Sequence, residues 1–269
     1  MTAMGRSSVY SGPDVRPLLN GERLVFVGGL HRSGTSLVHR CLSDHSEVSG
    51  FRNTGVPEDE GQHLQWVYPP AAAHGGSGRF GFDSASFLDE SSPLVSSVNT
   101  ERLLRDWARH WDLAKGVLIE KSPPNLVRTR FLQALYPASS FVIVLRHPVV
   151  VGYATQKWTP DLRIGTLIDH WLRCHERFVV DRPSLRKVHV LRYEDFVASP
   201  EEHLRSLQAF LGLRPEPLRR EVRSDVNNRY WALWERRGRG LFTRRYVQNV
   251  IARFEDRVAA LGYSLRAPA

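Results

Sequence analysis

A short apolar segment that runs into a glycine-rich loop and then into an amphipathic segment constrains this chain most. Residues 23–29 (RLVFVGG) have the length and apolar character of a buried strand, and residues 34–44 place their apolar side chains on one helical face. Glycine lets the loop between them turn tightly, and the amides of such a loop and of a helix N-terminus can cradle an anion. This order of elements predicts an α/β domain with an anion-binding loop.

The rest of the chain continues the alternation of strands and helices. Further strands are expected at 117–120, 140–145 and 187–191, and helices at 98–111, 125–136, after the 147–148 turn, and at 166–180, 200–211 and 247–261. The segment 140–145 (SFVIVL) is apolar throughout, as in a parallel strand that is covered on both faces. We therefore expect a single α/β domain over residues 23–269, with a central parallel sheet flanked by helices.

The first 22 residues differ from the rest in composition. They are polar, contain proline and glycine, and lack the apolar core of a signal peptide. This composition predicts a flexible N-terminal tail. The longest apolar stretch elsewhere, 141–154, is interrupted by Arg146 and His147, so no transmembrane segment is expected.

Composition restricts the classes of partner. The chain has 269 residues, 42% of them hydrophobic, which suffices for one large core. A net charge of +9 indicates either a basic surface that aids solubility or attraction to an anionic partner. No nucleic-acid module is recognisable and aromatic residues do not alternate with basic ones, so nucleic acid is not expected. Cys41 and Cys174 lack the spacing of a disulfide framework or a zinc site and favour a cytoplasmic location.

The glycine loop differs from the nucleotide-triphosphatase motif at one position. Thr35 follows Gly34, where a triphosphatase or kinase needs a lysine that reaches the terminal phosphates. Arg32 supplies a cation two residues before Gly34 instead. A P-loop nucleotide kinase is therefore the alternative function, and the loop favours another anionic ligand.

A second anion site is expected where the strand 140–145 ends. Arg146 follows this strand directly, before the turn at His147 and Pro148. Ligands of open α/β sheets bind at the carboxyl ends of the strands, and an arginine there can form paired hydrogen bonds with a phosphate.

Three segments in this order, GGLHRSGTS, EKSPPN and FVIVLRHP, resemble the sulfotransferases that use 3′-phosphoadenosine 5′-phosphosulfate (PAPS). The resemblance covers about residues 23–212 and is closest to bacterial members and to tyrosylprotein sulfotransferases. It implies a P-loop-like sulfotransferase fold, transfer of a sulfuryl group from PAPS to an acceptor hydroxyl, release of the desulfated product PAP, and no metal.

The resemblance also implies which residues hold the cofactor. The loop around the sulfated phosphate would comprise His31, Arg32, Ser33, Gly34, Thr35 and Ser36. Arg146 would hold the 3′-phosphate, and Tyr193 in the segment RYE would contact the nucleotide. The serine that the family places eight residues after this arginine is Ala154 here, with Thr155 as the substitute. The late basic run 235–240, which includes Arg237, either closes over the nucleotide together with Arg244 and Arg245 or is a solvated turn.

The catalytic groups are expected at two places. Lys121, at the end of the strand 117–120, matches the family lysine that contacts the leaving oxygen. The segment 56–63 holds three carboxylates and a histidine, and like charges at one place raise a carboxyl pKa toward a value useful for a base. The candidate bases are Glu60, then Glu58, then His63. If this segment is only a solvated acidic turn, the chain is a PAPS-binding protein without catalysis.

The acceptor is not specified by the sequence. A hydroxyl of a small molecule, a natural product or a lipid-linked sugar is expected, and a peptide tyrosine is a further alternative. Aromatic residues that would line an acceptor pocket are Trp66, Tyr68, Phe80, Phe82, Trp107, Trp111, Trp158, Trp231 and Trp234. The sequence indicates no oligomeric state.

Overall fold

The computed structural model describes residues 13–268. Within these residues five strands form one parallel sheet in the order β2-β3-β1-β4-β5. The strands are β1 (Leu24–Gly29), β2 (Val48–Gly50), β3 (Val117–Lys121), β4 (Ser140–Leu145) and β5 (Val188–Arg192). β1 lies in the middle, paired with β3 on one side and β4 on the other. The expected α/β domain with a central parallel sheet is confirmed.

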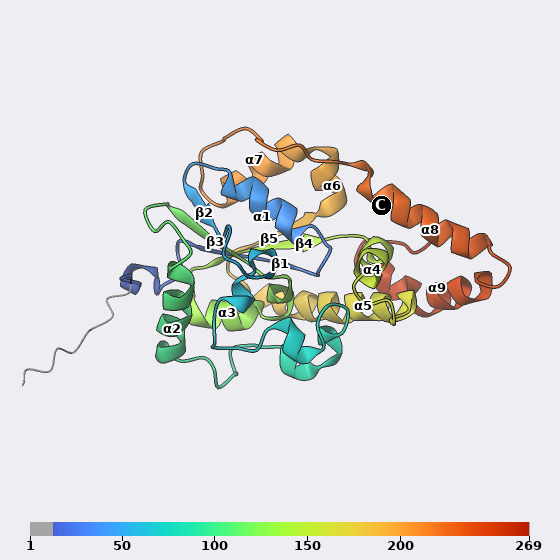
Figure 1. The fold of residues 1–269 in the computed structure, drawn as a ribbon, viewed down its shortest axis with the longest axis horizontal. Helices are drawn as coiled ribbons and strands as arrows, with labels where there is room; N and C mark the ends of the chain where they lie inside the picture. Colours follow the sequence, from blue (N-terminus) through green and yellow to red (C-terminus); the bar gives the residue numbers. More distant parts are fainter. Residues whose placement is uncertain (1–12, 269) are drawn as a thin grey trace, which may run out of the picture.

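Helices cover both faces of the sheet (Figure 1). They are α1 (Thr35–Ser43), α2 (Ser97–Ala108), α3 (Thr129–Leu135), α4 (Pro148–Gln156), α5 (Ile164–Asp181), α6 (Tyr193–Ala198), α7 (Pro200–Phe210), α8 (Asn228–Arg239) and α9 (Arg244–Ala259). α1, α6 and α7 lie over one face, and α2, α3 and α5 over the other (Figure 1). Alternate residues of β1 face opposite layers, with Val25 and Val27 packed toward α1 and Phe26 toward α2 and α3.

Three elements were not anticipated from the sequence. β2 is only three residues long, which is too short for a recognisable hydrophobic period. α6 follows β5 without a connecting loop. The basic run 235–240, interpreted as a late loop, lies within α8 as far as Arg239, because Tyr230, Trp231 and Trp234 bury one face of this helix.

The N-terminal segment requires a correction. Residues 1–12 of the expected tail lie outside the described residues. From residue 13 onward the chain packs on the domain, with Val15 and Leu18 almost fully buried in the cluster that contains Leu24 and Trp107. These two side chains, with the partly buried Leu19, hold the segment against the sheet layer.

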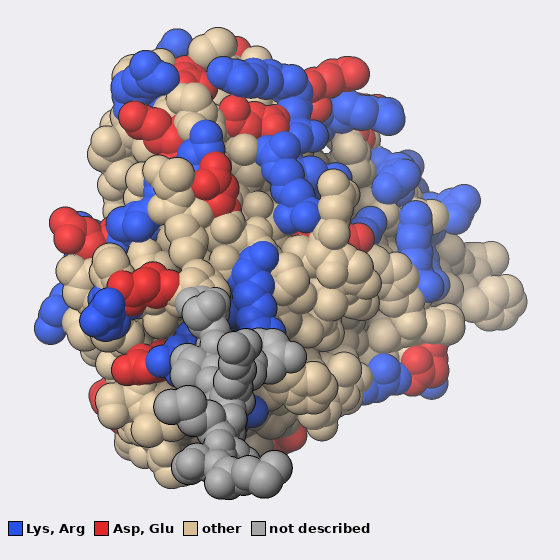
Figure 2. All heavy atoms as spheres, turned by 60° about the vertical axis from the view of Figure 1, so that its left-hand side comes forward, with Lys and Arg blue, Asp and Glu red and all other residues tan. Residues whose placement is uncertain are grey.

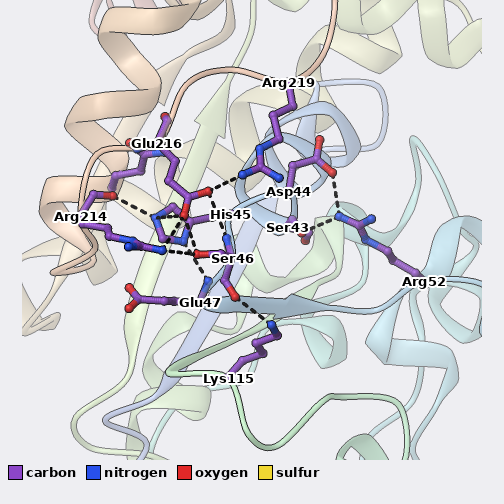
Figure 3. Close-up of polar contacts among 11 residues, drawn as sticks. Ser43, Asp44, His45, Ser46, Glu47, Arg52, Lys115, Arg214, Glu216 and Arg219 are labelled. Carbon is purple, nitrogen blue, oxygen red and sulfur yellow. Dashed lines mark hydrogen bonds and ion pairs between the residues drawn. The ribbon is translucent and has the colours of Figure 1, made fainter.

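A segment after α7 folds back over the end of α1 and the turn that follows it (Figure 3). The carboxylate of Glu216 accepts hydrogen bonds from the amide and the hydroxyl of Ser46 and forms an ion pair with Arg219. Asp44, at the C-terminal end of α1, pairs with Arg52 on the other side. These contacts fix the C-terminal end of α1 and thereby the direction of its N-terminus.

Charged residues of both signs share the surface. On the face shown in Figure 2, Lys and Arg side chains gather in the upper part with carboxylates among them. Elsewhere on the molecule, opposite charges also pair, as in the ion pair of Asp44 with Arg220. The positive net charge is therefore partly compensated locally. Between residues 13 and 268 no helix is long and apolar enough to cross a membrane.

Candidate active site

Residues of the loop between β1 and α1 stabilise the conformation of this loop. Gly34, with φ +104°, caps α1, and the hydroxyl of Ser33 accepts a hydrogen bond from the amide of Leu30 at 3.1 Å. Ser33 is fully buried, so its hydroxyl stabilises the loop from inside. Within residues 13–268, no carbonyl accepts from the amides of Gly34, Thr35 and Ser36. These N–H groups at a helix N-terminus form an anion cradle.

Tyr193 covers this loop at close range. A Cβ atom on Gly34 would lie 2.4 Å from Cδ2 of Tyr193, so only glycine fits beneath the ring. Tyr193 starts α6 directly after β5, and the guanidinium carbon of Arg146 lies 3.9 Å from the centre of its ring. The tyrosine therefore bridges the loop and the arginine.

Arg146, which follows β4, is buried and held by neutral acceptors. Its Nη1 donates to the carbonyl oxygen of Arg32 at 2.9 Å, and its Nε and Nη2 donate to Oδ1 of Asn227 at 3.0 and 2.6 Å. Burial lowers the pKa of this guanidinium, which nonetheless stays protonated in proteins. No carboxylate within residues 13–268 forms an ion pair with it, so its charge is available to an anion.

Lys121 and Glu60 form a buried ion pair. Lys121 is the last residue of β3, and its Nζ lies 3.2 Å from Oε1 of Glu60. The same Nζ donates to the main-chain carbonyl of Glu58 at 2.7 Å. Gln62 donates its side-chain amide to the other oxygen of Glu60. The lysine and the carboxylate are therefore both fixed in place.

The other two candidate bases lie at different depths. Glu58 is exposed, adopts a positive φ of 52° and accepts a hydrogen bond from the hydroxyl of Ser36 at 3.3 Å. His63 places Nε2 3.9 Å from Oε2 of Glu60 and lines neither of the cavities described next. Glu58 thus touches the phosphate loop directly, whereas His63 contacts the site only through Glu60.

One cavity of about 230 Å³ collects most of the expected residues. Its lining includes His31, Arg32, Gly34, Thr35, Ser36, Glu58, Glu60, Arg146 and Tyr193. A second cavity of about 370 Å³ adjoins it, shares Ser36, Arg40 and Glu58, and reaches Lys121. Glu58 therefore stands between the two cavities, and Lys121, which lines the larger one, is linked to the smaller one through its ion pair with Glu60.

Three expected cofactor residues do not line the phosphate-loop cavity. Thr155 is buried on α4 and its methyl group faces Gly78, because the helix turns this position toward the core. Arg237 places its guanidinium carbon 5.5 Å from the ring centre of Tyr153, on the side of α8 that packs against α4. Ser33 also lies behind the loop instead of lining the cavity.

The sequence interpretation missed two contributors to the site, Arg40 and Asn227, and assigned a third, Trp158, to an acceptor pocket. Arg40 lines both cavities, and its spacing of four residues from Ser36 on a helix was a usable signal. Trp158 lines the phosphate-loop cavity under the guanidinium of Arg32, at 4.8 Å. Asn227 holds Arg146 from 81 residues away, for which no local pattern exists. Most of the other aromatic residues expected at an acceptor pocket are buried in the core, namely Tyr68, Phe80, Trp107, Trp111, Trp231 and Trp234.

A buried carboxyl group supports the site from behind. Glu120, next to Lys121 on β3, accepts hydrogen bonds from the side chains of Ser122 and Asn125, and burial raises its pKa to about 7. Asn125 also donates to the main-chain carbonyl of Val27 in β1 at 3.2 Å. A Cβ on Gly61 would touch Glu120, so the segment that carries Glu60 packs tightly on this group.

The residues that line the phosphate-loop cavity are suited to bind anionic groups. Free loop amides, Arg32 and an unneutralised Arg146 face one cavity. In residues 13–268, His, Cys, Asp and Glu side chains form no group of three or more that could hold a metal ion. Burial lowers the pKa of His31, whose Nδ1 has no hydrogen-bond partner in this part of the chain.

Comparisons with known proteins agree with this geometry. A putative protein-tyrosine sulfotransferase from Caenorhabditis briggsae is 28% identical over 221 residues, covering 73% of this chain and 68% of that protein. Nodulation protein NoeE from Sinorhizobium fredii (strain NBRC 101917 / NGR234) is 25% identical over 232 residues, covering 75% of this chain and 52% of that protein. The chain thus spans between about half and two thirds of the length of these relatives.

The fold and the sequence both match the same group of proteins. The sulfotransferase domain of the Synechococcus PCC 7002 olefin synthase superposes with a TM-score of 0.50 at 16% identity, covering 77% of this chain and 86% of that domain, which shows a shared fold. The family model described as the sulfotransferase family matches residues 25–217, from β1 to the segment after α7. This chain therefore belongs to the sulfotransferase family.

Proposed function

We propose that the protein transfers the sulfuryl group of PAPS to an acceptor hydroxyl and releases PAP. One observation carries the proposal: a single cavity is lined by the phosphate loop, by Arg146 and by Glu60, with Lys121 paired to Glu60. The family matched over residues 25–217 gives the reaction class. PAPS would supply the activated sulfuryl group, and the residues of this chain would bind it and handle charge and protons.

The anionic groups of the nucleotide would be held by two parts of the site. The amides of Gly34, Thr35 and Ser36, with the guanidinium of Arg32, would bind the sulfated 5′-phosphate. Arg146 would bind the 3′-phosphate, because a buried arginine with neutral partners gains most from a charged ligand.

Protons and the leaving charge would be handled by the ion pair. Glu60 would accept the proton of the acceptor hydroxyl, and Nζ of Lys121 would stabilise negative charge on the leaving phosphate. Their mutual contact orients the carboxylate and the ammonium before the reaction. Glu58, at the junction of the two cavities, is the alternative base.

The larger cavity is the proposed acceptor site. It opens at Glu58 and Lys121 and has about 370 Å³, which suits part of a small molecule or the head of a lipid-linked sugar. A cytoplasmic location is also part of the proposal and is supported by Cys41 and Cys174, both free and buried.

Nucleotide binding and transfer test the proposal separately. PAP should raise the melting temperature, since a ligand at a hundredfold excess over its Kd stabilises the native state by about 2.7 kcal/mol. ATP should raise it much less. Transfer of ³⁵S from labelled PAPS to an acceptor library then tests catalysis. Equal shifts with ATP and PAP would contradict the nucleotide assignment, and a PAP shift without any transfer would favour a PAPS-binding protein without catalysis.

A further inference from the structure

The turn between α8 and α9 exposes two adjacent apolar side chains. Leu241 is 93% exposed and Phe242 is 98% exposed. The two helices form a hairpin that extends from the side of the domain, with this turn at its tip (Figure 1). Single exposed apolar residues are common, but a protruding neighbouring pair of this size is a feature of binding surfaces.

The apolar tip is surrounded by positive charge. Residues 236–254 contain six arginines and no aspartate or glutamate. The arginines nearest to the tip are Arg236, Arg237, Arg239, Arg244 and Arg245. Within residues 13–268, only Arg239 of these five forms an ion pair, with Glu235 at 3.4 Å. The charge around the tip is therefore largely uncompensated.

The hairpin does not need its tip to fold. Trp234 donates its indole N–H to the carbonyl of Leu265 at 2.8 Å, and it packs in the core with Val247, Val250 and Phe254. The apolar faces of both helices are thus already buried at the base of the hairpin. Leu241 and Phe242 remain free for an external partner, on a hairpin that lies beyond the residues matched by the family model.

We propose that the α8–α9 tip docks on an anionic lipid surface, with Leu241 and Phe242 at the boundary between headgroups and acyl chains. A bilayer interface can bind both the apolar pair and the positive charge of the tip, because apolar side chains insert while arginines contact acidic headgroups. Nucleic acid would use the charge but not the protruding apolar pair. A second copy of the tip would bring like charges together.

Docking at the tip would also orient the active site. α8 begins next to Asn227, which bonds Arg146, and its 12 residues span about 18 Å from there to the tip. A lipid-linked acceptor would then meet the protein at the same surface. This last step rests on the proposed function, whereas the docking itself does not.

Vesicle co-sedimentation of the full chain tests the docking. Vesicles with a phosphatidylglycerol fraction of about a third should bind the protein, and pure phosphatidylcholine vesicles much less. The double variant Leu241→Ser/Phe242→Ser should weaken binding roughly tenfold. Arg244→Gln/Arg245→Gln should weaken it by a similar factor and reduce its salt dependence, because three arginines remain near the tip. Leu241→Ile/Phe242→Trp should keep binding, because it keeps the apolar character.

Matched variants at other surface positions distinguish vesicle binding by the tip from a general effect of removing exposed apolar or charged side chains. Val179→Ser/Val180→Ser removes another adjacent pair of exposed apolar side chains, and Arg102→Gln/Arg109→Gln removes two other exposed charges. Both should bind vesicles like the parent chain. An unchanged urea midpoint in the absence of lipid and nucleotide verifies that each variant is folded.

Three results would overturn the proposal. One is unchanged vesicle binding by Leu241→Ser/Phe242→Ser. Another is duplex DNA binding that exceeds vesicle binding and is insensitive to this double variant. The third is a lipid-free oligomer, seen by light scattering, that the double variant dissociates while vesicle binding is unchanged, which would assign the tip to a second copy of the chain.

Discussion

Glu60 shares a buried ion pair with Lys121, and its carboxylate still lines the phosphate-loop cavity. Glu60→Gln preserves the size of the side chain and an acceptor for Nζ of Lys121, but it removes the ability to accept a proton. Turnover should fall by a factor of about 10²–10⁴, while PAP affinity stays nearly unchanged. Single-turnover transfer from labelled PAPS and calorimetric titration with PAP measure the two quantities.

A more acidic acceptor hydroxyl provides the control for this substitution. It should partly restore the rate of Glu60→Gln, because a weaker base then suffices, and should help Lys121→Ala little. If Glu60→Gln retains the parent rate, the base is another residue, and Glu58→Gln and His63→Ala identify it by the same two measurements.

Substitutions of Arg146 and of its partner Asn227 test whether Arg146 binds the 3′-phosphate. Arg146→Ala should weaken PAP binding roughly tenfold to a hundredfold, since a hydrogen bond to a charged group contributes about 1.5–3 kcal/mol. Asn227→Asp should also weaken it, because a carboxylate would now compete with the phosphate for the guanidinium. In both variants the rate at saturating PAPS should change less than the affinity. A normal PAP affinity in Asn227→Asp would contradict the assignment.

At the scale of elements, the hairpin of α8 and α9 depends on a few large side chains at its base. Trp234 is 3% exposed, and its indole N–H donates to Leu265. Trp234→Ala should lower the free energy of unfolding by about 3–5 kcal/mol, because it removes a large buried side chain and leaves a cavity. Urea unfolding measures this loss. Arg236→Ala, an exposed position on the same helix, should change stability by less than about 0.5 kcal/mol, and an equal effect of both variants would show that helix propensity dominates.

Local patterns sufficed for the elements that carry the phosphate loop and Arg146. β4 was predicted with its observed limits, and the glycine loop was predicted between β1 and α1, because each depends on residues adjacent in the chain. α8 was missed although Tyr230, Trp231 and Trp234 have helical spacing, because the arginines after them favoured a solvated turn. Contacts such as Arg146 with Asn227 join distant segments and leave no local pattern.

The candidate site residues also divide into those placed by adjacent residues and those placed by contacts between distant segments. Lys121 could be placed at a strand end from the sequence, but its contact with Glu60 depends on how the irregular segment 56–63 folds back. Thr155 follows the expected position by one residue, and one residue turns a helical side chain by about 100°, here toward Gly78. Sequence spacing on a helix therefore decides such an assignment only when the orientation of the helix is known.

At the scale of the whole molecule, buried histidines determine how stability responds to acid. Burial lowers the pKa of His39 and His170 to about 3 and of His175 to about 4, below the ordinary value of 6.5. Below pH 6.5 these histidines therefore bind protons in the unfolded chain but stay neutral in the native state. The free energy of unfolding falls as the pH falls toward their native pKa values. The slope approaches about 1.4 kcal/mol per pH unit for each such histidine.

Glu120 has the opposite effect on the pH dependence of stability. Its pKa of about 7 exceeds the ordinary 4.5, so its contribution is present at low pH and is lost as the pH rises from 4.5 through 7. The contribution of this one carboxyl group to the pH dependence cancels that of about one buried histidine. A net loss of stability on acidification should therefore remain. Urea midpoints measured between about pH 7.5 and pH 5.5 test this, and His175→Asn should reduce the dependence. A midpoint that rises on acidification would contradict the expectation.

The central position of β1 has a consequence for the order in which parts of the molecule open. Parallel neighbours pair with β1 on both sides, and α1 and α2 cover it, so its amides should exchange with deuterium only when the whole domain unfolds. The α8–α9 hairpin projects from the side of the domain and should exchange earlier. The strand that carries the phosphate loop would then outlast the Asn227 contact, and Arg146 could be released and recaptured many times within the lifetime of one folded molecule.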